Sequence, residues 1–233
     1  MHRFIAENLV SHSTVELTPE QSHHLLHVLR LKTGQLVELF DGRGITAQGI
    51  LVDELPTGCH VQIQSLTSAD TRSRITLAFG YTKGPAFDFI VRKGTEIGVA
   101  AFQPLFTAHS LRINEWNANR WTKVISEVGK QCQETTLPTM NEPKKIDSWL
   151  TSREPHNGLI FCHESKRDST PPFFAANANF DLLVGAEGGW SAEETDRILK
   201  LGAVPLGLGK NRLRAETAAL VALTLLKSKV GEI

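Results

Sequence analysis

The chain has 233 residues, of which 41% are hydrophobic and 21% charged, a composition typical of a globular protein with one large or two small domains. This composition excludes a disordered or collagen-like chain, and the balance of 25 Lys and Arg against 25 Asp and Glu gives no overall charge signature of nucleic-acid or membrane-surface binding. No apolar run approaches the roughly 20 residues of a membrane span, and the first residues lack the apolar segment of a signal peptide, so we expect a cytoplasmic protein.

Residues 1–70 are predicted to form a small β-rich domain. Short strands are indicated by four alternating apolar segments, over 15–17, 36–40, 45–52 and 61–66. The tetrapeptide DGRG at 41–44 indicates a hairpin turn between two of them. One helix is expected to begin at Pro19 with Thr18 as its cap. Its expected buried stripe consists of Leu25, Leu26, Val28 and Leu29. The polar stretch 67–74 is expected to be a linker.

Residues 71–233 alternate strand-like with helix-like segments, which is the pattern of an α/β domain with a mostly parallel sheet. Strands are expected over 75–79, 102–106, 159–162, 182–184 and 204–208. Helices are expected over 87–97, 115–131, 192–201 and 215–229. Because such sheets bind ligands at the carboxyl ends of their strands, the loops that follow the strands are the first candidates for a site.

Neither a disulfide framework nor a metal site is indicated. Cys59, Cys132 and Cys162 are odd in number and form no C-x-x-C pair, so we expect buried, reduced thiols. His23 and His27 stand four residues apart on the predicted helix, as metal-binding pairs do. They lack an H-E-x-x-H motif and an evident third ligand, so we expect no metal and interpret this helix as a surface or RNA-facing one.

Two glycine-rich loops follow predicted strands. The first, VGAEGGW at 184–190, leads into a capping box formed by Ser191 and Glu194. A tight turn needs one or two glycines and this loop has three, which favours a binding loop. Trp190 is either a base-stacking residue or a core anchor. The second loop, LGLGKNRLRAETAAL at 206–220, follows the next strand along the chain, so the two loops are expected to enclose one small molecule. Neither has the spacing of the usual ATP or NAD sites.

These two segments resemble the cofactor-binding signature of the RsmE family, the SPOUT-class methyltransferases that methylate a uridine of 16S ribosomal RNA at ring nitrogen 3. HHLLHVLRLKTGQLVELFDGRG at 23–44 and KGPAFDFIVRKGTEIGVAAFQPLF at 83–106 are similar to further parts of that family. The resemblance implies a PUA-like β-barrel over 1–70 that docks RNA and a SPOUT α/β trefoil-knot domain over 71–233 that binds S-adenosylmethionine. It also implies a homodimer whose partner is 16S rRNA in the small ribosomal subunit.

The resemblance places the cofactor between the two loops, whose glycines and apolar side chains suit an adenine ring. The expected cofactor-binding residues are Leu183, Gly185, Glu187, Gly188, Gly189, Leu206, Leu208, Gly209, Leu213, Thr217 and Ala218. Transfer to the uridine nitrogen needs removal of its proton or stabilisation of the developing oxyanion. Glu187 and Glu216 are candidates for the base and Arg214 for the cationic partner. An equally open reading of Glu216 is a first-turn acid that complements the helix dipole.

Three positions depart from the family pattern. Ala186 stands where proline is usual, Asn211-Arg212 displaces an expected arginine by one position, and Ala108-His109 replaces a common Glu-Arg pair. These changes leave the cofactor loops intact and alter the expected RNA contacts. Two alternatives therefore stay open: a non-catalytic RNA-binding or ribosome-assembly protein of the same fold, and a SPOUT methyltransferase that acts on another RNA.

Overall fold

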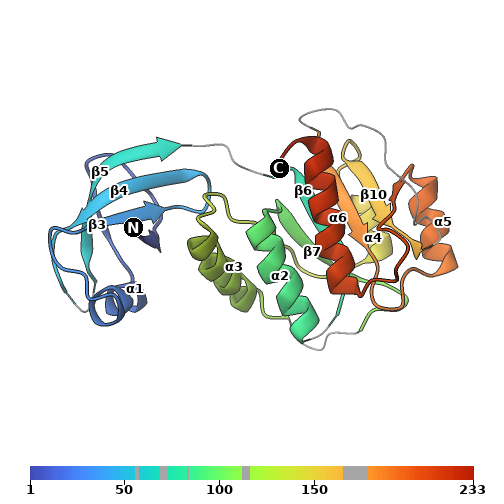
Figure 1. Cartoon of the computed structure of the whole chain (residues 1–233), viewed down its shortest axis with the longest axis horizontal. Coiled ribbons are helices and arrows are strands. Elements are labelled where there is room, and N and C mark those ends of the chain that lie inside the picture. Colours follow the sequence, from blue (N-terminus) through green and yellow to red (C-terminus); the bar gives the residue numbers. More distant parts are fainter. Residues whose placement is uncertain (56–57, 69–72, 83, 112–115, 165–177) are drawn as a thin grey trace. The chain divides into compact units, whose positions relative to one another are not determined.

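The computed structural model describes the chain except for residues 56–57, 69–72, 83, 112–115 and 165–177. It consists of two compact units (Figure 1). The first comprises residues 1–72 together with 126–137, and the second comprises 73–125 together with 138–233. Part of the expected linker lies outside the described residues, while its first two residues belong to a strand.

Within its described residues, the first unit holds a five-stranded sheet of order β1-β3-β4-β5-β2. Its strands are β1 (His2–Ile5), β2 (Thr14–Glu16), β3 (Leu36–Phe40), β4 (Ile45–Leu51) and β5 (His60–Ser68). All but β1 were predicted. The predicted hairpin joins β3 to β4, where Asp41 Oδ1 accepts hydrogen bonds from the N–H groups of Arg43 (2.7 Å) and Ile45 (3.0 Å).

The helix of the first unit begins as predicted but has an unexpected second half. Helix α1 (Pro19–His23) opens with a capping box between Thr18 and Gln21 and continues as the π-helical segment η1 (His24–Val28). Leu25 is fully buried, whereas Val28 is 61% exposed, so the prediction of a buried Val28 is wrong. The wider π turn has i to i+5 hydrogen bonds, and this rotates Val28 away from the apolar stripe.

The second unit holds a parallel sheet of seven strands among its described residues, in the order β12-β10-β11-β6-β7-β8 with β9 also paired to β7. The strands are β6 (Ile75–Gly80), β7 (Ala101–Phe106), β8 (Thr139–Met140), β9 (Lys144–Lys145), β10 (Gly158–Cys162), β11 (Phe180–Val184) and β12 (Val204–Leu206). The helices are α2 (Pro85–Ile97), the first half of α3 (Ala118–Cys132), α4 (Ile146–Ser152), α5 (Ala192–Lys200) and α6 (Ala215–Val230). The predicted α/β alternation is confirmed, but β8, β9 and α4 were not predicted.

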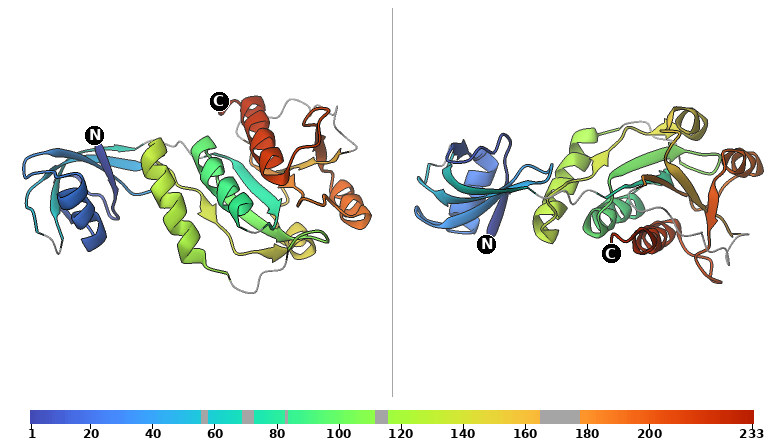
Figure 2. Two further views of the ribbon diagram at one scale, coloured as in Figure 1. Left: turned by 60° about the horizontal axis from the view of Figure 1, so that its bottom comes forward. Right: turned by 90° about the horizontal axis from the view of Figure 1, so that it is seen from above.

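Helices cover both faces of this sheet (Figure 2). Helices α2 and α6 pack against each other on one face, and α4 and α5 lie on the other. Under α4 and α5, Phe161 and Leu183 from the central strands are fully buried beside Trp149 and Ile198. Burying a side chain of this size contributes roughly 1.5–3 kcal/mol, so the two layers fix the sheet that carries the loops. Among the described residues, no helix combines the length and apolar character that crossing a bilayer would take.

Residues 126–137, which include the end of α3, complete the first unit. Gly44 N–H donates a hydrogen bond to Thr135 O (3.0 Å), and Leu137 N–H donates one to Gly42 O (2.8 Å). The Leu137 side chain also packs under Gly42, where a Cβ would stand 3.1 Å from Leu137 Cδ1. The hairpin at 41–44 is therefore anchored by a segment that lies about 90 residues further along the chain.

Candidate functional site

A cavity of about 850 Å³ lies at the carboxyl ends of β10, β11 and β12, a volume within the range of small-molecule sites. Its wall consists of the two predicted loops, the segment 162–164 after β10, and the start of α2. Strand β10 lies between β11 and β12 in the sheet, so the two predicted loops leave strands that are not neighbours. Residues 162–164, at the end of β10 and directly after it, also line the cavity, and the sequence has no glycine there that would have pointed to them.

The first loop is a tight turn in which close contacts and backbone conformation account for the glycines. Gly189 N–H donates to Ala186 O (2.8 Å), and Gly189 has φ of +70°. A Cβ on Gly185 would stand 3.1 Å from Gly189 Cα, and a Cβ on Gly188 would stand 2.7 Å from His109 Cβ. A side chain at Gly188 would clash, one at Gly189 would be strained and one at Gly185 would fit tightly, and the three glycines expose backbone in the cavity wall.

Gly80, the last residue of β6, brings the root of this loop against the sheet. A Cβ at Gly80 would stand 2.4 Å from Ala186 N and 2.8 Å from Ala186 Cα. Both contacts are to backbone, so no rotation of a side chain could relieve them. Gly80 was not among the predicted site residues, although a glycine that ends a buried apolar strand is a signal of close backbone approach.

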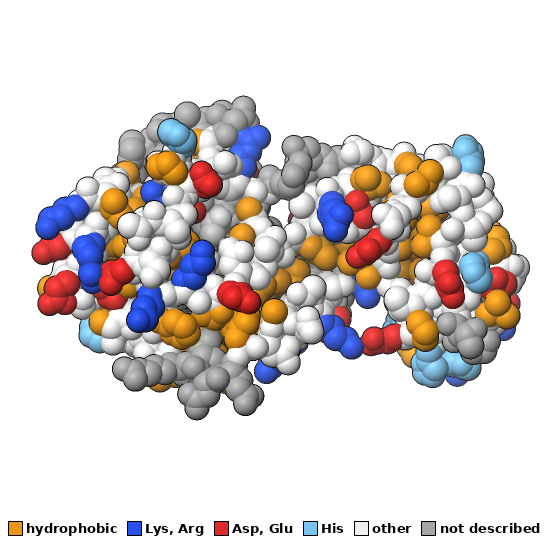
Figure 3. Space-filling model, turned by 180° about the vertical axis from the view of Figure 1, so that it is seen from behind, with side chains coloured by type: hydrophobic (Ala, Val, Ile, Leu, Met, Phe, Trp, Pro, Cys, Tyr) orange, Lys and Arg blue, Asp and Glu red, His pale blue; other side chains and the backbone are white. Residues whose placement is uncertain are grey.

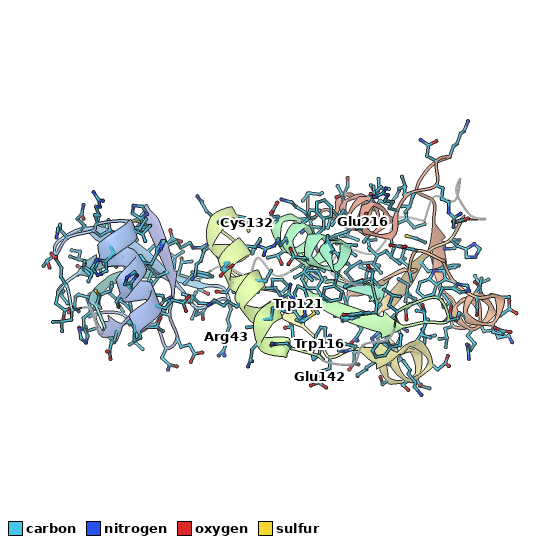
Figure 4. The ribbon with its side chains drawn as sticks, turned by 90° about the horizontal axis from the view of Figure 1, so that it is seen from below. Arg43, Trp116, Trp121, Cys132, Glu142 and Glu216 are labelled. Carbon is cyan, nitrogen blue, oxygen red and sulfur yellow. The ribbon has the colours of Figure 1, made fainter. Side chains whose placement is uncertain are left out.

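The second loop leads into α6, whose N-cap residue is Arg214. Arg214 is exposed, and Glu216 is half-buried in the first turn of α6 (Figure 4); both line the cavity. Gly209 has φ of +89°, a conformation that favours glycine. Arg212 Nε lies 2.8 Å from Glu164 Oε1, which joins this loop to the segment after β10.

Eleven of the thirteen residues predicted for the site line the cavity: Gly185, Glu187, Gly188, Gly189, Leu206, Leu208, Gly209, Leu213, Arg214, Glu216 and Ala218. Leu183 lies outside it because successive strand residues face opposite sides, and Leu183 is buried in the core under α4 and α5 while Val184 lines the cavity. Thr217 is exposed on α6 and is not part of the lining.

Two residues of the cavity wall, Cys162 and Trp190, are uncharged and are joined by a hydrogen bond. Burial raises the pKa of Cys162 to about 12, so its thiol stays protonated at physiological pH. Trp190 is 8% exposed, and its Nε1–H donates a hydrogen bond to Cys162 O (3.0 Å). Trp190 is therefore a core anchor, which decides between its two earlier interpretations.

Two further expectations concern the cysteines and the histidine pair. Cys59 and Cys162 are buried as expected, but Cys132 is exposed at the end of α3, so the expectation of three buried thiols is wrong there. The sequence shows cysteine identity but not which face of a helix end meets solvent. The rings of His23 and His27 are 4.6 Å apart, and no group of three metal-binding side chains occurs in the described part of the chain.

Comparison with known proteins gives matches over both units. A family model described as an RNA methyltransferase domain matches residues 69–227, and one described as an RNA methyltransferase PUA domain matches residues 17–64. The ribosomal RNA small subunit methyltransferase E of Synechocystis is 30% identical over 229 residues, which is 94% of this chain and 74% of that protein.

Two solved structures with bound S-adenosylmethionine are also similar. Ribosomal RNA small subunit methyltransferase E from Neisseria gonorrhoeae has a TM-score of 0.90 and 26% identity, covering 98% of this chain and 97% of that one. A putative methyltransferase from Legionella pneumophila has a TM-score of 0.83 and 28% identity, covering 97% of this chain and 96% of that one. Both matches extend over nearly the whole chain, so they include the loops that form the cavity.

Proposed function

The chain belongs to the ribosomal RNA small subunit methyltransferase E (RsmE) family, and we propose that it transfers the methyl group of S-adenosylmethionine to ring nitrogen 3 of a uridine in 16S rRNA. The resemblance found in the sequence is confirmed, and the fold is a SPOUT-type α/β domain preceded by a PUA domain. The observation that supports the activity most directly is the cavity that the two signature loops form at the carboxyl ends of the sheet. The trefoil knot and the homodimer that the family implies are part of this proposal.

The cavity fits the cofactor. Its glycine turn offers bare backbone, and Val184, Leu206, Leu208 and Leu213 offer apolar surface, which together suit an adenosine group. When bound, the cofactor supplies an electrophilic methyl group on a sulfonium. The protein residues that would hold it are the cavity-lining residues of the two loops, and they need no lysine clamp because the adenosine carries no phosphate.

The catalytic step requires the uridine nitrogen to lose its proton. We assign that proton to a cavity-lining carboxylate, either Glu216 on the first turn of α6 or Glu187 on the first loop. Loss of the proton leaves negative charge on the uracil oxygens, which Arg214 at the N-cap of α6 would stabilise. Arg214 lies at the exposed edge of the cavity, where it can meet substrate rather than the cationic cofactor.

The surface charge bears on how RNA is recognised. Lys and Arg side chains are intermingled with Asp and Glu on the face of the second unit drawn in Figure 3, and the chain has no formal net charge. A protein with this charge distribution has low nonspecific electrostatic affinity for RNA. We therefore propose recognition by shape, with the assembled small subunit in the cytoplasm as the substrate.

The test is transfer of radiolabelled methyl from S-adenosylmethionine to small ribosomal subunits from cells that lack this protein, with the modified base identified by mass spectrometry. Label at ring nitrogen 3 of a uridine is the expected result. Cofactor binding without label on this RNA would favour a methyltransferase for another RNA. Neither binding nor label would favour a non-catalytic protein of the same fold.

A further inference from the structure

Glu194 is a buried acid next to the cavity that contributes nothing to the cavity wall. It is 3% exposed and lies in the first turn of α5. Its Oε2 accepts a hydrogen bond from Ser191 N–H (2.9 Å), and its own N–H donates to Ser191 Oγ (3.2 Å), which completes the capping box. Burying a carboxylate costs free energy unless its oxygens have hydrogen-bond partners, so the partner of the second oxygen shows what else Glu194 holds in place.

The second oxygen of Glu194 binds a different part of the chain. Glu194 Oε1 accepts a hydrogen bond from Ala108 N–H at 2.7 Å, a short distance typical of charge-assisted bonds. Ala108 follows β7 and is 86 residues away in sequence. Helix capping uses one carboxylate oxygen, and capping residues at other helices are often exposed, so capping alone explains neither this bond nor the burial.

The segment that Glu194 holds is itself a compact turn. Thr107 N–H donates to Ser110 Oγ (2.9 Å), and Ser110 N–H donates to Thr107 O (3.3 Å). This turn places His109 directly against the first loop of the cavity, where its Cβ occupies the space next to Gly188. His109 Nδ1 also lies 3.4 Å from Gly189 O. The turn therefore packs against the glycine loop through His109, which is not among the residues that line the cavity.

We propose that Glu194 is a positioning residue for the cofactor: its carboxylate joins the 107–110 turn to the glycine loop and holds Gly188 and Gly189 in the shape that S-adenosylmethionine binds. This inference rests on the proposed function. The residue acts through the loop, since one oxygen fixes the loop's end at Ser191 and the other fixes the turn that carries His109. Loss of either hydrogen bond releases one of the two segments that Glu194 holds, the 107–110 turn or the end of the loop at Ser191.

The test uses Glu194→Gln and Ala108→Pro in the full chain, with the dissociation constant for S-adenosylmethionine measured by titration calorimetry. Glu194→Gln keeps the size of the side chain but replaces one acceptor oxygen by a donor. Ala108→Pro removes the N–H group and leaves the capping box intact. We expect each to weaken cofactor binding about tenfold, the scale of one hydrogen bond to a charged group. In both variants the KM for S-adenosylmethionine should rise. The kcat should stay within about twofold of the wild-type value, because saturating cofactor restores the shape of the loop.

Two matched controls separate positioning from helix capping. Glu193→Gln removes an exposed charge from the same turn, and it should leave the dissociation constant within about twofold of wild type. Ser191→Ala removes the capping hydroxyl but keeps both acceptor contacts of Glu194, so it should lower the melting temperature with a similarly small change in affinity. Amide exchange at Ala108 should accelerate in Glu194→Gln only.

Wild-type affinity in both Glu194→Gln and Ala108→Pro would overturn the proposal, and so would an equal loss of affinity in Ser191→Ala. If Glu194→Gln fails to fold, Ala108→Pro alone decides between these outcomes. Failure of the wild-type protein to bind S-adenosylmethionine is a different result, because it refutes the proposed function itself.

Discussion

Replacing Gly80 by alanine tests whether close backbone packing shapes the cofactor loop. The new Cβ would stand 2.4 Å from Ala186 N, whereas ordinary contacts begin at 3.4 Å, so β6 and the loop must separate by about 1 Å. Overpacking of this kind costs about 1–3 kcal/mol of unfolding free energy. If the bound state carries about 1.4 kcal/mol more of that strain than the free protein does, the affinity for S-adenosylmethionine falls about tenfold.

Calorimetric titration of S-adenosylmethionine into the variant, paired with thermal denaturation, measures both effects. Gly49→Ala is the matched control, because its Cβ would stand 2.4 Å from Val61 Cγ1 in the first unit, whose described residues contribute nothing to the cavity lining. The control should lose stability and keep its cofactor affinity. Unchanged affinity in Gly80→Ala, or an equal loss in Gly49→Ala, would refute the reasoning.

Three other predictions concern charge and thiol chemistry. Arg214→Ala should lower kcat for methyl transfer about 100-fold, the scale of one lost oxyanion donor, with cofactor affinity nearly unchanged; parallel losses in both would indicate a structural role. Ellman's reagent at pH 8 should label Cys132 quickly and Cys162 only after unfolding, because burial holds the pKa of Cys162 at about 12; fast labelling of both would contradict the buried position. Arg153→Met should reduce the unfolding free energy by about 3–5 kcal/mol at pH 7, because it strips the partner from buried Asp181, 2.8 Å away. Burial already raises the pKa of Asp181, so this loss should shrink as the pH falls towards 4 and the carboxyl is protonated; a loss independent of pH in urea titrations would contradict the assignment.

The elements that the sequence predicted contain either a hydrophobic period or an unbroken apolar run of at least three residues. Helix α6 and strand β11 are examples, and both lie within two residues of their expected bounds. The two-residue strands β8 and β9 and the seven-residue helix α4 carry no such period. The π turn after α1 was equally invisible, because helical spacing alone does not distinguish i to i+4 from i to i+5 bonding.

The parts of the site that consist of consecutive residues could be predicted from the sequence. The glycine loop at 184–190 and the loop that follows β12 were predicted from their own residues, and the family resemblance indicated their function. Gly80 and the segment 162–164 were missed because their roles come from strand order, which places β10 between β11 and β12 and β6 beside β11. The link from Glu194 to Ala108 was not predictable for the same reason, since it joins the first turn of α5 to the segment after β7, which only the folded chain brings together.

The split composition of the first unit has a consequence for how the protein is made. Its hairpin at 41–44 exchanges backbone hydrogen bonds with 135–137, and a nascent chain leaves the ribosome N-terminus first. The hairpin therefore has no partner until residues 73–125 of the second unit have also been synthesised. A gene fragment that stops at residue 72 would encode every strand that the structure describes in the first unit, and its hairpin would still lack the hydrogen bonds to 135–137.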